Sequence, residues 1–322
     1  MNDVEARAAH DFLLPVFDAE IARLRDAVGR VLAAHDAQRA GGRAPAKRAN
    51  ASAAAAPAAQ PDDEAVHDLR VSLRRLRTAL RPARRVYGKR RLEPVERALR
   101  HHARASGALR DEEVLRETMS ALVLAPRVRA DVTAWLARRR AKERARRKAL
   151  VESVRADDGA RFRARGSGPP EDRVPSVLDV LVNLSRLFVP KGRAPAADEL
   201  GARALAAAAE AVIAASAVDP EDTHALHALR ICFKRLRYTV ELLAPLYGER
   251  AARIGASAAA LQKQLGAVHD LDQAAGFVRR ARSLPRSARA ALLPALAARR
   301  ARVIARAMAE LAGALVVVRS VV

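Results

Sequence analysis

The sequence predicts an all-α protein, and three of its features point to this fold class. Half of the 322 residues are hydrophobic but only 3% are aromatic. Much of the apolar content is alanine, which favours closely packed helices over strands. Apolar residues recur at helical spacing along most of the chain, and no strand-like alternation or Asn-Gly hairpin turn competes with that pattern. One helical segment also occurs twice, at a fixed offset.

The repeated segment comprises residues 67–88 (HDLRVSLRRLRTALRPARRVYG) and 227–248 (HALRICFKRLRYTVELLAPLYG). The two copies align without a gap at an offset of 160, and eight of the 22 positions are identical. The same register returns where LARRRAKERAR at 136–146 matches LAARRARVIAR at 296–306. A fixed register over this length indicates an internal duplication. The identical pairs are His67/His227, Leu69/Leu229, Arg70/Arg230, Arg75/Arg235, Leu76/Leu236, Arg77/Arg237, Tyr87/Tyr247 and Gly88/Gly248.

Helix beginnings and ends are marked in both copies. The Tyr-Gly pairs at 87–88 and 247–248 predict helix ends with a glycine just beyond the last helical residue. Proline followed by acidic residues at 61–64 and 220–222 predicts helix beginnings, where a missing N–H and a negative charge are both favourable. The expected helices span 11–37, 62–87, 92–123, 127–155, 174–188, 196–216, 221–247, 250–281 and 286–318.

The duplication predicts two structural units. We expect an N-terminal helical bundle over 1–160, a linker over 161–175 that is rich in glycine, proline and charge, and a C-terminal helical bundle over 176–322. Within the first unit, residues 38–60 (QRAGGRAPAKRANASAAAAPAAQ) are of low complexity and are expected to form a surface loop.

The charge of the chain predicts a polyanionic partner. Lys and Arg number 59 against 36 Asp and Glu, a net charge of +23, and nucleic acid, a membrane surface and a phosphate polymer all suit such a field. The single cysteine, Cys232, excludes a disulfide framework and a multi-cysteine zinc site. With no apolar run of membrane-spanning length and no signal-peptide pattern, we expect a cytoplasmic protein that does not insert into membranes.

Each copy of the repeated helix carries a basic stripe beside its apolar face, as a projection at about 100° per residue shows. A solvated helix face usually mixes acids and bases, whereas these stripes contain almost no acid. Like charges one turn apart destabilise a helix, so a bound anion would offset the repulsion. The first stripe consists of His67, Arg70, Arg74, Arg77 and Arg81. The second stripe consists of His227, Arg230, Lys234 and Arg237, after which Glu241 replaces the arginine.

A further set of basic residues corresponds between the copies and forms a secondary candidate site. Arg139 and Arg146, and their counterparts Arg299 and Arg306, fall in the same sector as apolar residues of their helices. Such arginines either extend outward to solvent or line an internal polar channel, and both alternatives stay open. The remaining corresponding pair is Arg104 and Lys263.

The doubled motif H-x-L-R-(V/I)-x-x-(R/K)-R-L-R, followed in each half by G-x-x-(R/H)-D, closely resembles the conserved histidine α-helical domain, CHAD. The resemblance covers about 11–318. It implies two four-helix bundles related by a pseudo-twofold axis, with the motif helices facing each other across a basic central pore. It also implies that the pore binds long-chain inorganic polyphosphate and that the protein associates with polyphosphate granules. The resemblance assigns binding to His67, Arg70, Arg74, Arg77, His227, Arg230, Lys234 and Arg237.

The chain departs from the family pattern at two places. Arg110 of the first G-x-x-R-D becomes His269 in the second copy, and the insert at 38–60 is longer than the family needs. Polyphosphate carries about one charge per phosphate and no bases, so repeated charge-assisted Arg–phosphate contacts suit it. His67 and His227 would gain charge near such a polyanion, which predicts stronger binding at mildly acidic pH.

We expect no catalytic activity, no cofactor and no metal. The E-x-E-x-K, G-x-x-x-x-G-K-[ST], H-E-x-x-H and G-x-S-x-G motifs are all absent from the sequence. The chief alternative is a nucleoid-type nucleic-acid-binding protein, since weak non-specific affinity for nucleic acid is expected at this net charge. A third interpretation is a granule scaffold, for which polyphosphate is the tether and granule proteins are the partners.

Overall fold

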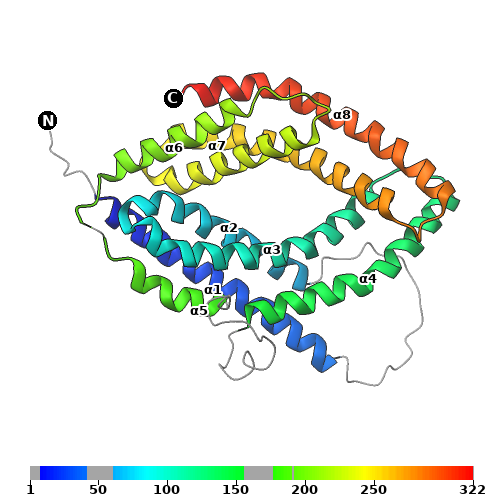
Figure 1. Cartoon of the computed structure of the whole chain (residues 1–322), viewed down its shortest axis with the longest axis horizontal. Helices are drawn as coiled ribbons and strands as arrows, with labels where there is room; N and C mark the ends of the chain where they lie inside the picture. Colours follow the sequence, from blue (N-terminus) through cyan, green and yellow to red (C-terminus); the bar gives the residue numbers. More distant parts are fainter. Residues whose placement is uncertain (1–7, 42–60, 156–176, 191, 322) are drawn as a thin grey trace. The chain divides into compact units, whose positions relative to one another are not determined.

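The computed structural model describes residues 8–41, 61–155, 177–190 and 192–321, and this part of the chain is helical (Figure 1). It contains no strand, only an isolated bridge between Ala8 and Ala196. The all-α prediction is confirmed. The helices are α1 (Ala9–Gly41), α2 (Pro61–Tyr87), α3 (Lys89–Ser120), α4 (Pro126–Val154), α5 (Val177–Leu184), a short 3-10 turn (Ser185–Leu187), α6 (Ala197–Ala214), α7 (Thr223–Arg280) and α8 (Arg286–Arg319).

Both predicted Tyr-Gly helix ends are present. Gly88 adopts a φ of 88° directly after α2, and its N–H donates to the carbonyl of Arg84 over 3.0 Å. Gly248 adopts a φ of 49° and a ψ of −126°, so α7 consists of two helical segments, 223–247 and 249–280, joined at this glycine. Positive φ values are costly for residues with a Cβ atom, which explains glycine at both positions.

Two predicted irregular segments fall largely beyond what the structure describes. Helix α1 continues to Gly41, four residues into the stretch expected to be a loop. Residues 42–60 and the predicted linker at 161–175 lie outside the described residues. The helices within the described ranges otherwise begin and end close to the predicted positions.

The chain divides into two compact units. Unit 1 comprises residues 1–9, 109–144 and 195–322, and unit 2 comprises residues 10–108 and 145–194. Helices α3 and α4 contribute residues to both units, so the compact units do not coincide with the two sequence repeats. The repeat boundary at 161–175 therefore stays a prediction.

Unit 2 is built around the apolar face of α2. Leu69, Leu73, Leu76 and Leu80 are fully buried there, as the period of the apolar residues predicts. Tyr87, at the end of α2, belongs to a small aromatic cluster. Its ring centroid lies 6.2 Å from that of Phe17 on α1 and 5.1 Å from that of Phe188. The rings of Phe17 and Phe188 stack on each other with their centroids 4.2 Å apart.

In unit 1, helices α6, α7 and α8 pack against one another (Figure 1). The end of α3 and the beginning of α4 join them through an apolar cluster that includes Leu115, Trp135, Leu271 and Leu292. This cluster connects helices from both sequence repeats, a contact that periodicity alone does not predict. None of the helices in the described ranges has a stretch long and apolar enough to cross a membrane.

The duplicated tyrosines anchor equivalent helices in the two units. In unit 2, the Tyr87 hydroxyl lies 3.0 Å from Nδ1 of His10 on α1. In unit 1, the Tyr247 hydroxyl donates to the carbonyl oxygen of Asp198 on α6 over 3.1 Å. A Cβ atom on Gly201 of α6 would lie only 2.9 Å from the same hydroxyl, so this glycine makes room for the tyrosine. Helices α1 and α6 thus occupy corresponding places in the repeat.

Candidate anion-binding site

The first segment of α7 places the second stripe beside the core of unit 1. Leu229, Phe233 and Leu236 are fully buried, and the basic side chains next to them are half-buried. Asp222 caps this helix, because its side chain accepts hydrogen bonds from the backbone N–H groups of residues 224 and 225. The half-buried residues of the stripe are His227, Arg230, Lys234 and Arg237.

The second segment of α7 brings the G-x-x-H-D motif against the second stripe. A Cβ atom on Gly266 would lie 3.6 Å from Nε of Arg230, so the guanidinium packs on the face of this glycine. Nδ1 of His269 lies 3.2 Å from Nδ1 of His227, and the two ring centroids are 4.5 Å apart. The two motifs, which the sequence separates by about forty residues, therefore contact each other. Sequence reasoning named both motifs but did not predict this contact.

Burial and positive charge together set the protonation of this cluster. Burial lowers the pKa of His227, and the charges of Arg230 and Lys234 lower it further. Burial lowers the pKa of His269 to about 4, with added effects from Arg230, His227 and Lys234. Burial also raises the pKa of Asp270, against the opposing effect of Arg230. Both imidazoles are consequently uncharged at neutral pH in the free protein.

Arg237 closes the second stripe at its C-terminal end. Its Nε donates to Oε1 of Glu241 over 2.7 Å, and its guanidinium lies over the ring of Tyr238 at 5.5 Å from the centroid. The carboxylate that replaces an arginine of the first stripe therefore neutralises part of the charge of Arg237. The second stripe is shorter than the first for this reason.

The first stripe lies in unit 2, along α2. His67 and Arg81 at its ends are exposed, whereas Arg70, Arg74 and Arg77 are half-buried beside the fully buried leucines. The His67 ring makes no hydrogen bond to any other residue that the structure describes.

The repeat equivalent of His269 is Arg110, which behaves differently from the histidine. In unit 1 its Nη1 lies 3.4 Å from Oε2 of Glu113 and 3.2 Å from Oε1 of Glu117. This position therefore carries an ion-paired, permanent cation in the first copy of the motif and a titratable imidazole in the second.

Arginines from α3 extend the positive cluster around the first stripe. Burial lowers the pKa of Arg77, and the like charges of Arg81, Arg100 and Arg104 lower it further. The nearby carboxylate of Glu96 opposes this shift. The same carboxylate forms a bidentate ion pair with Arg84, with Nε to Oε1 at 2.6 Å.

Arg100 was not predicted from the sequence. Alanine occupies the corresponding positions, 259 and 260, so the repeat gives no signal for this arginine. The one indication in the sequence that Arg100 belongs to the basic cluster was its position one helical turn before Arg104.

The secondary candidates do not form one group. The guanidinium of Arg139 makes a bidentate ion pair with the buried carboxylate of Glu112, at 2.7 and 2.9 Å, and lies 4.7 Å from the ring centroid of Phe277. Arg146 and Arg299 donate to backbone carbonyls, of residues 108 and 121 respectively. The sequence did not predict these two contacts of Arg139. Arg104, Lys263 and Arg306 are exposed.

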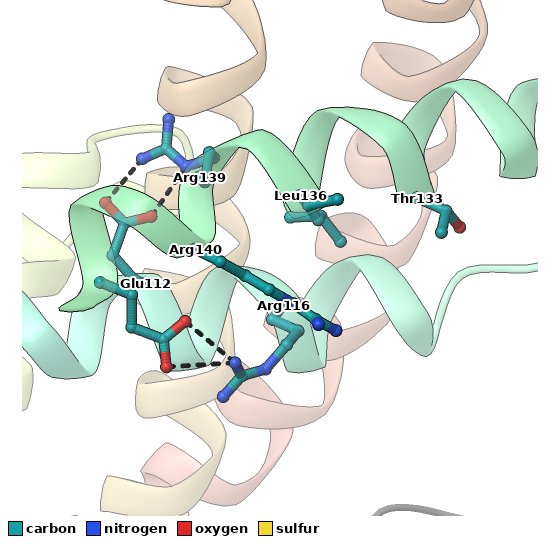
Figure 2. Close-up of a pocket in the computed structure, with 8 residues that line it drawn as sticks. Glu112, Arg116, Thr133, Leu136, Arg139 and Arg140 are labelled. Carbon is teal, nitrogen blue, oxygen red and sulfur yellow. Dashed lines mark hydrogen bonds and ion pairs between the residues drawn. The ribbon is translucent and has the colours of Figure 1, made fainter. Parts of the chain in front are cut away.

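A cavity of about 370 Å³ lies between the end of α3 and the beginning of α4, and Figure 2 shows its lining. In addition to the pair of Arg139 and Glu112, Arg116 donates to both oxygens of Glu143 at 3.2 and 3.0 Å. These carboxylates neutralise two of the arginines and would repel a polyanion, so the cavity is a poor candidate for the anion site. Across the described ranges, no group of three or more His, Cys, Asp and Glu residues is arranged to hold a metal ion.

The fold and the stripes define a class of protein: an all-α chain with a duplicated helix that presents half-buried basic residues. The family model of the CHAD domain matches residues 43–279, and the chain belongs to this family. The family prediction from the doubled motif is confirmed.

A solved structure shows the same fold. The crystal structure of the CHAD domain from the plant Ricinus communis covers 95% of this chain and 92% of its own, with 18% identity and a TM-score of 0.67. PptA from Streptomyces chartreusis aligns over 98% of this chain and 99% of its own, with 18% identity and a TM-score of 0.49. No curated protein matches the sequence.

Proposed function

We propose that this chain is a non-catalytic binding protein for long-chain inorganic polyphosphate, which it holds along the first and second stripes. One observation carries the proposal: in both stripes half-buried basic side chains lie close enough together to repel one another. Burial is the main cause of the lowered pKa of Arg77, His227 and His269. Neighbouring basic groups lower these pKa values further, chiefly Arg81 and Arg100 at Arg77, and Arg230 and Lys234 at the two histidines. Each stripe is therefore a site of concentrated positive potential, which a bound polyanion would relieve.

Polyphosphate suits these stripes better than a nucleic acid does. Half-buried arginines beside a helix core favour a thin, flexible chain of phosphates over a stacked duplex. A base-stacking platform needs several aromatic side chains, and only 3% of the residues are aromatic. The prediction from the family resemblance that both stripes line one basic pore is part of this proposal.

A competition assay tests the choice of ligand. Labelled duplex DNA is bound to the full chain and then displaced, in separate titrations, with long-chain polyphosphate or with unlabelled DNA. The two competitors are compared at equal phosphate concentration. We expect polyphosphate to displace DNA at far lower phosphate equivalents. Equal displacement by unlabelled DNA would favour the nucleoid-type alternative instead.

A charge-reversal variant locates the binding site in the same assay. A variant with four substitutions, Arg70→Glu, Arg74→Glu, Arg230→Glu and Lys234→Glu, should weaken polyphosphate binding much more than DNA binding. The matched control reverses four exposed arginines outside the stripes, Arg90, Arg127, Arg282 and Arg286, so that the net charge changes equally. Circular dichroism confirms that both variants fold. Equal losses in the two variants would show that only the net charge matters.

We further propose that polyphosphate binding recruits the protein to polyphosphate granules in the cell. A fluorescent fusion should form foci in cells that accumulate polyphosphate and spread evenly in cells that lack it. Foci that persist without polyphosphate would support the scaffold alternative, in which granule proteins hold the chain.

A further inference from the structure

We infer that His227 and His269 form a proton-dependent phosphate subsite within the second stripe, with the imidazole pair taking up one proton when a phosphate binds. The inference rests on the proposed function and adds His269 to the binding residues. It also distinguishes the second copy of the G-x-x-(R/H)-D motif from the first copy, in which an ion-paired arginine occupies the position equivalent to His269.

The geometry of the pair limits its protonation states. The two Nδ1 atoms are 3.2 Å apart, so one of them donates a hydrogen and the other accepts it. Two protonated Nδ1 atoms would direct their hydrogens at each other. The pair therefore exists either as two neutral imidazoles or as one imidazolium that donates to one neutral imidazole, and it gains at most one proton in this arrangement.

Burial, and after it the charged groups around the pair, keep both imidazoles uncharged at neutral pH in the free protein. His224, Arg230 and Lys234 from the first segment of α7 all disfavour a further positive charge on His227. Asp270 follows His269 in the sequence, and its own environment contains the charges of Arg110, Asp111 and Glu117 from α3 as well as Arg230.

A phosphate chain along the second stripe reverses this balance. Its negative charge offsets Arg230 and Lys234, and each phosphate oxygen accepts hydrogen bonds from a cationic imidazole. Protonation of the pair is then favoured in the complex and disfavoured without ligand. A proton is taken up on binding, so affinity increases as the pH falls.

The pH window separates this pair from an ordinary histidine. An exposed histidine is already protonated in the free protein below about pH 6, so it adds little to the pH dependence there. In the buried pair the pKa of His269 is about 4 and the pKa of His227 is also lowered, so the pair gains its proton at a lower pH than an ordinary histidine does. Proton uptake by the pair on binding therefore continues below the pH range in which an ordinary exposed histidine contributes.

The experiment measures the affinity of the full chain for long-chain polyphosphate, whose internal phosphates stay ionised throughout, at several values between about pH 8 and pH 5. Between about pH 6 and 5 we expect the affinity of the wild type to rise several-fold, with a limit of tenfold per pH unit for one proton. His269→Gln should lose this rise. His269→Arg, which introduces the residue of the first copy, should lose it too and bind more tightly at pH 7.

An exposed histidine outside both stripes supplies the matched control, because His101→Gln should keep the rise below pH 6. If the rise survives in His269→Gln, carboxylate titration at a site such as Asp270 accounts for it and the inference is wrong. Absence of binding at every pH would instead overturn the proposed function.

A second measurement needs no variant, in case His269→Gln fails to fold. The imidazole nitrogens of the wild type are followed by NMR as the pH changes, with and without polyphosphate. An increase in the pKa of the pair on binding supports the inference, and an unchanged value overturns it.

Discussion

The first and second stripes share one sequence motif, yet different neighbours determine their charge. The first stripe lies among further arginines, including Arg100 and Arg104, and ends in an exposed His67. The second stripe faces an imidazole, a glycine and a carboxylate from the later part of its own helix, at His269, Gly266 and Asp270. A repeated motif therefore fixes the position of basic residues beside a core, whereas residues far away in the sequence decide which of them can gain or lose a proton.

The largest expected effect is on the free energy of unfolding. It concerns the apolar helix face beside each stripe, where the two stripes are most alike. Leu76→Ala and Leu236→Ala each remove a fully buried side chain and should destabilise the protein by about 2–5 kcal/mol. Denaturant unfolding measures both. A loss below about 1 kcal/mol at either site would show that the corresponding core is not closely packed.

The next effect separates the contributions of the two stripes to binding. Arg70→Gln with Arg74→Gln, and Arg230→Gln with Lys234→Gln, each remove two charge-assisted contacts and should weaken polyphosphate binding about a hundredfold. Each pair should also reduce the dependence of affinity on salt. Fluorescence polarisation at several salt concentrations measures both quantities. A pair of substitutions without effect would exclude that stripe from the site.

The third effect concerns the free energy of unfolding of the protein without ligand, which should depend on pH because of the buried His227–His269 pair. The pKa of His269 is about 4 in the folded state and about 6.5 in the unfolded chain, so the unfolded chain binds more protons between these values. The stabilisation from neutral His269 is complete above about pH 6.5 and is lost as the pH falls toward 4, by about 1–2 kcal/mol once screening by solvent is allowed for. Urea unfolding at both pH values should show a smaller loss for His269→Gln than for His101→Gln. Equal losses would contradict the assignment.

The smallest effect concerns the arginine that only the first stripe has beside it. Arg100→Gln removes one exposed cation near Arg77 and should lower polyphosphate affinity about threefold to tenfold, less than either pair of stripe substitutions. Ala260→Arg, which places an arginine near the corresponding position of the second half, is the reciprocal change and should raise affinity. Arg100→Gln without any effect would limit the first stripe to α2.

Much of the fold was predictable because its determinants are local. The period of Leu69, Leu73 and Leu76 defines the buried face of α2, and Gly88 and Gly248 mark helix ends by a backbone conformation that favours glycine. The family followed from the doubled motif for the same reason, since both copies are short and contiguous.

The unpredicted features all depend on contacts between distant residues. The pairing of His227 with His269 requires the turn at Gly248, and the ion pair of Arg139 with Glu112 requires the packing of α4 on α3. Helical projection placed Arg139 correctly on a core-facing sector, but it contains no information about the carboxylate on the next helix. The charge state of a basic residue depends on such partners, so it could not be predicted from helical periodicity.

A crystal structure of the full chain with bound long-chain polyphosphate tests the central claim most directly. The account predicts phosphate density within hydrogen-bonding distance of Arg70 and Arg74 in the first stripe and of Arg230 and Lys234 in the second. Phosphate density elsewhere on the surface, with both stripes empty and paired with acidic side chains, would contradict it.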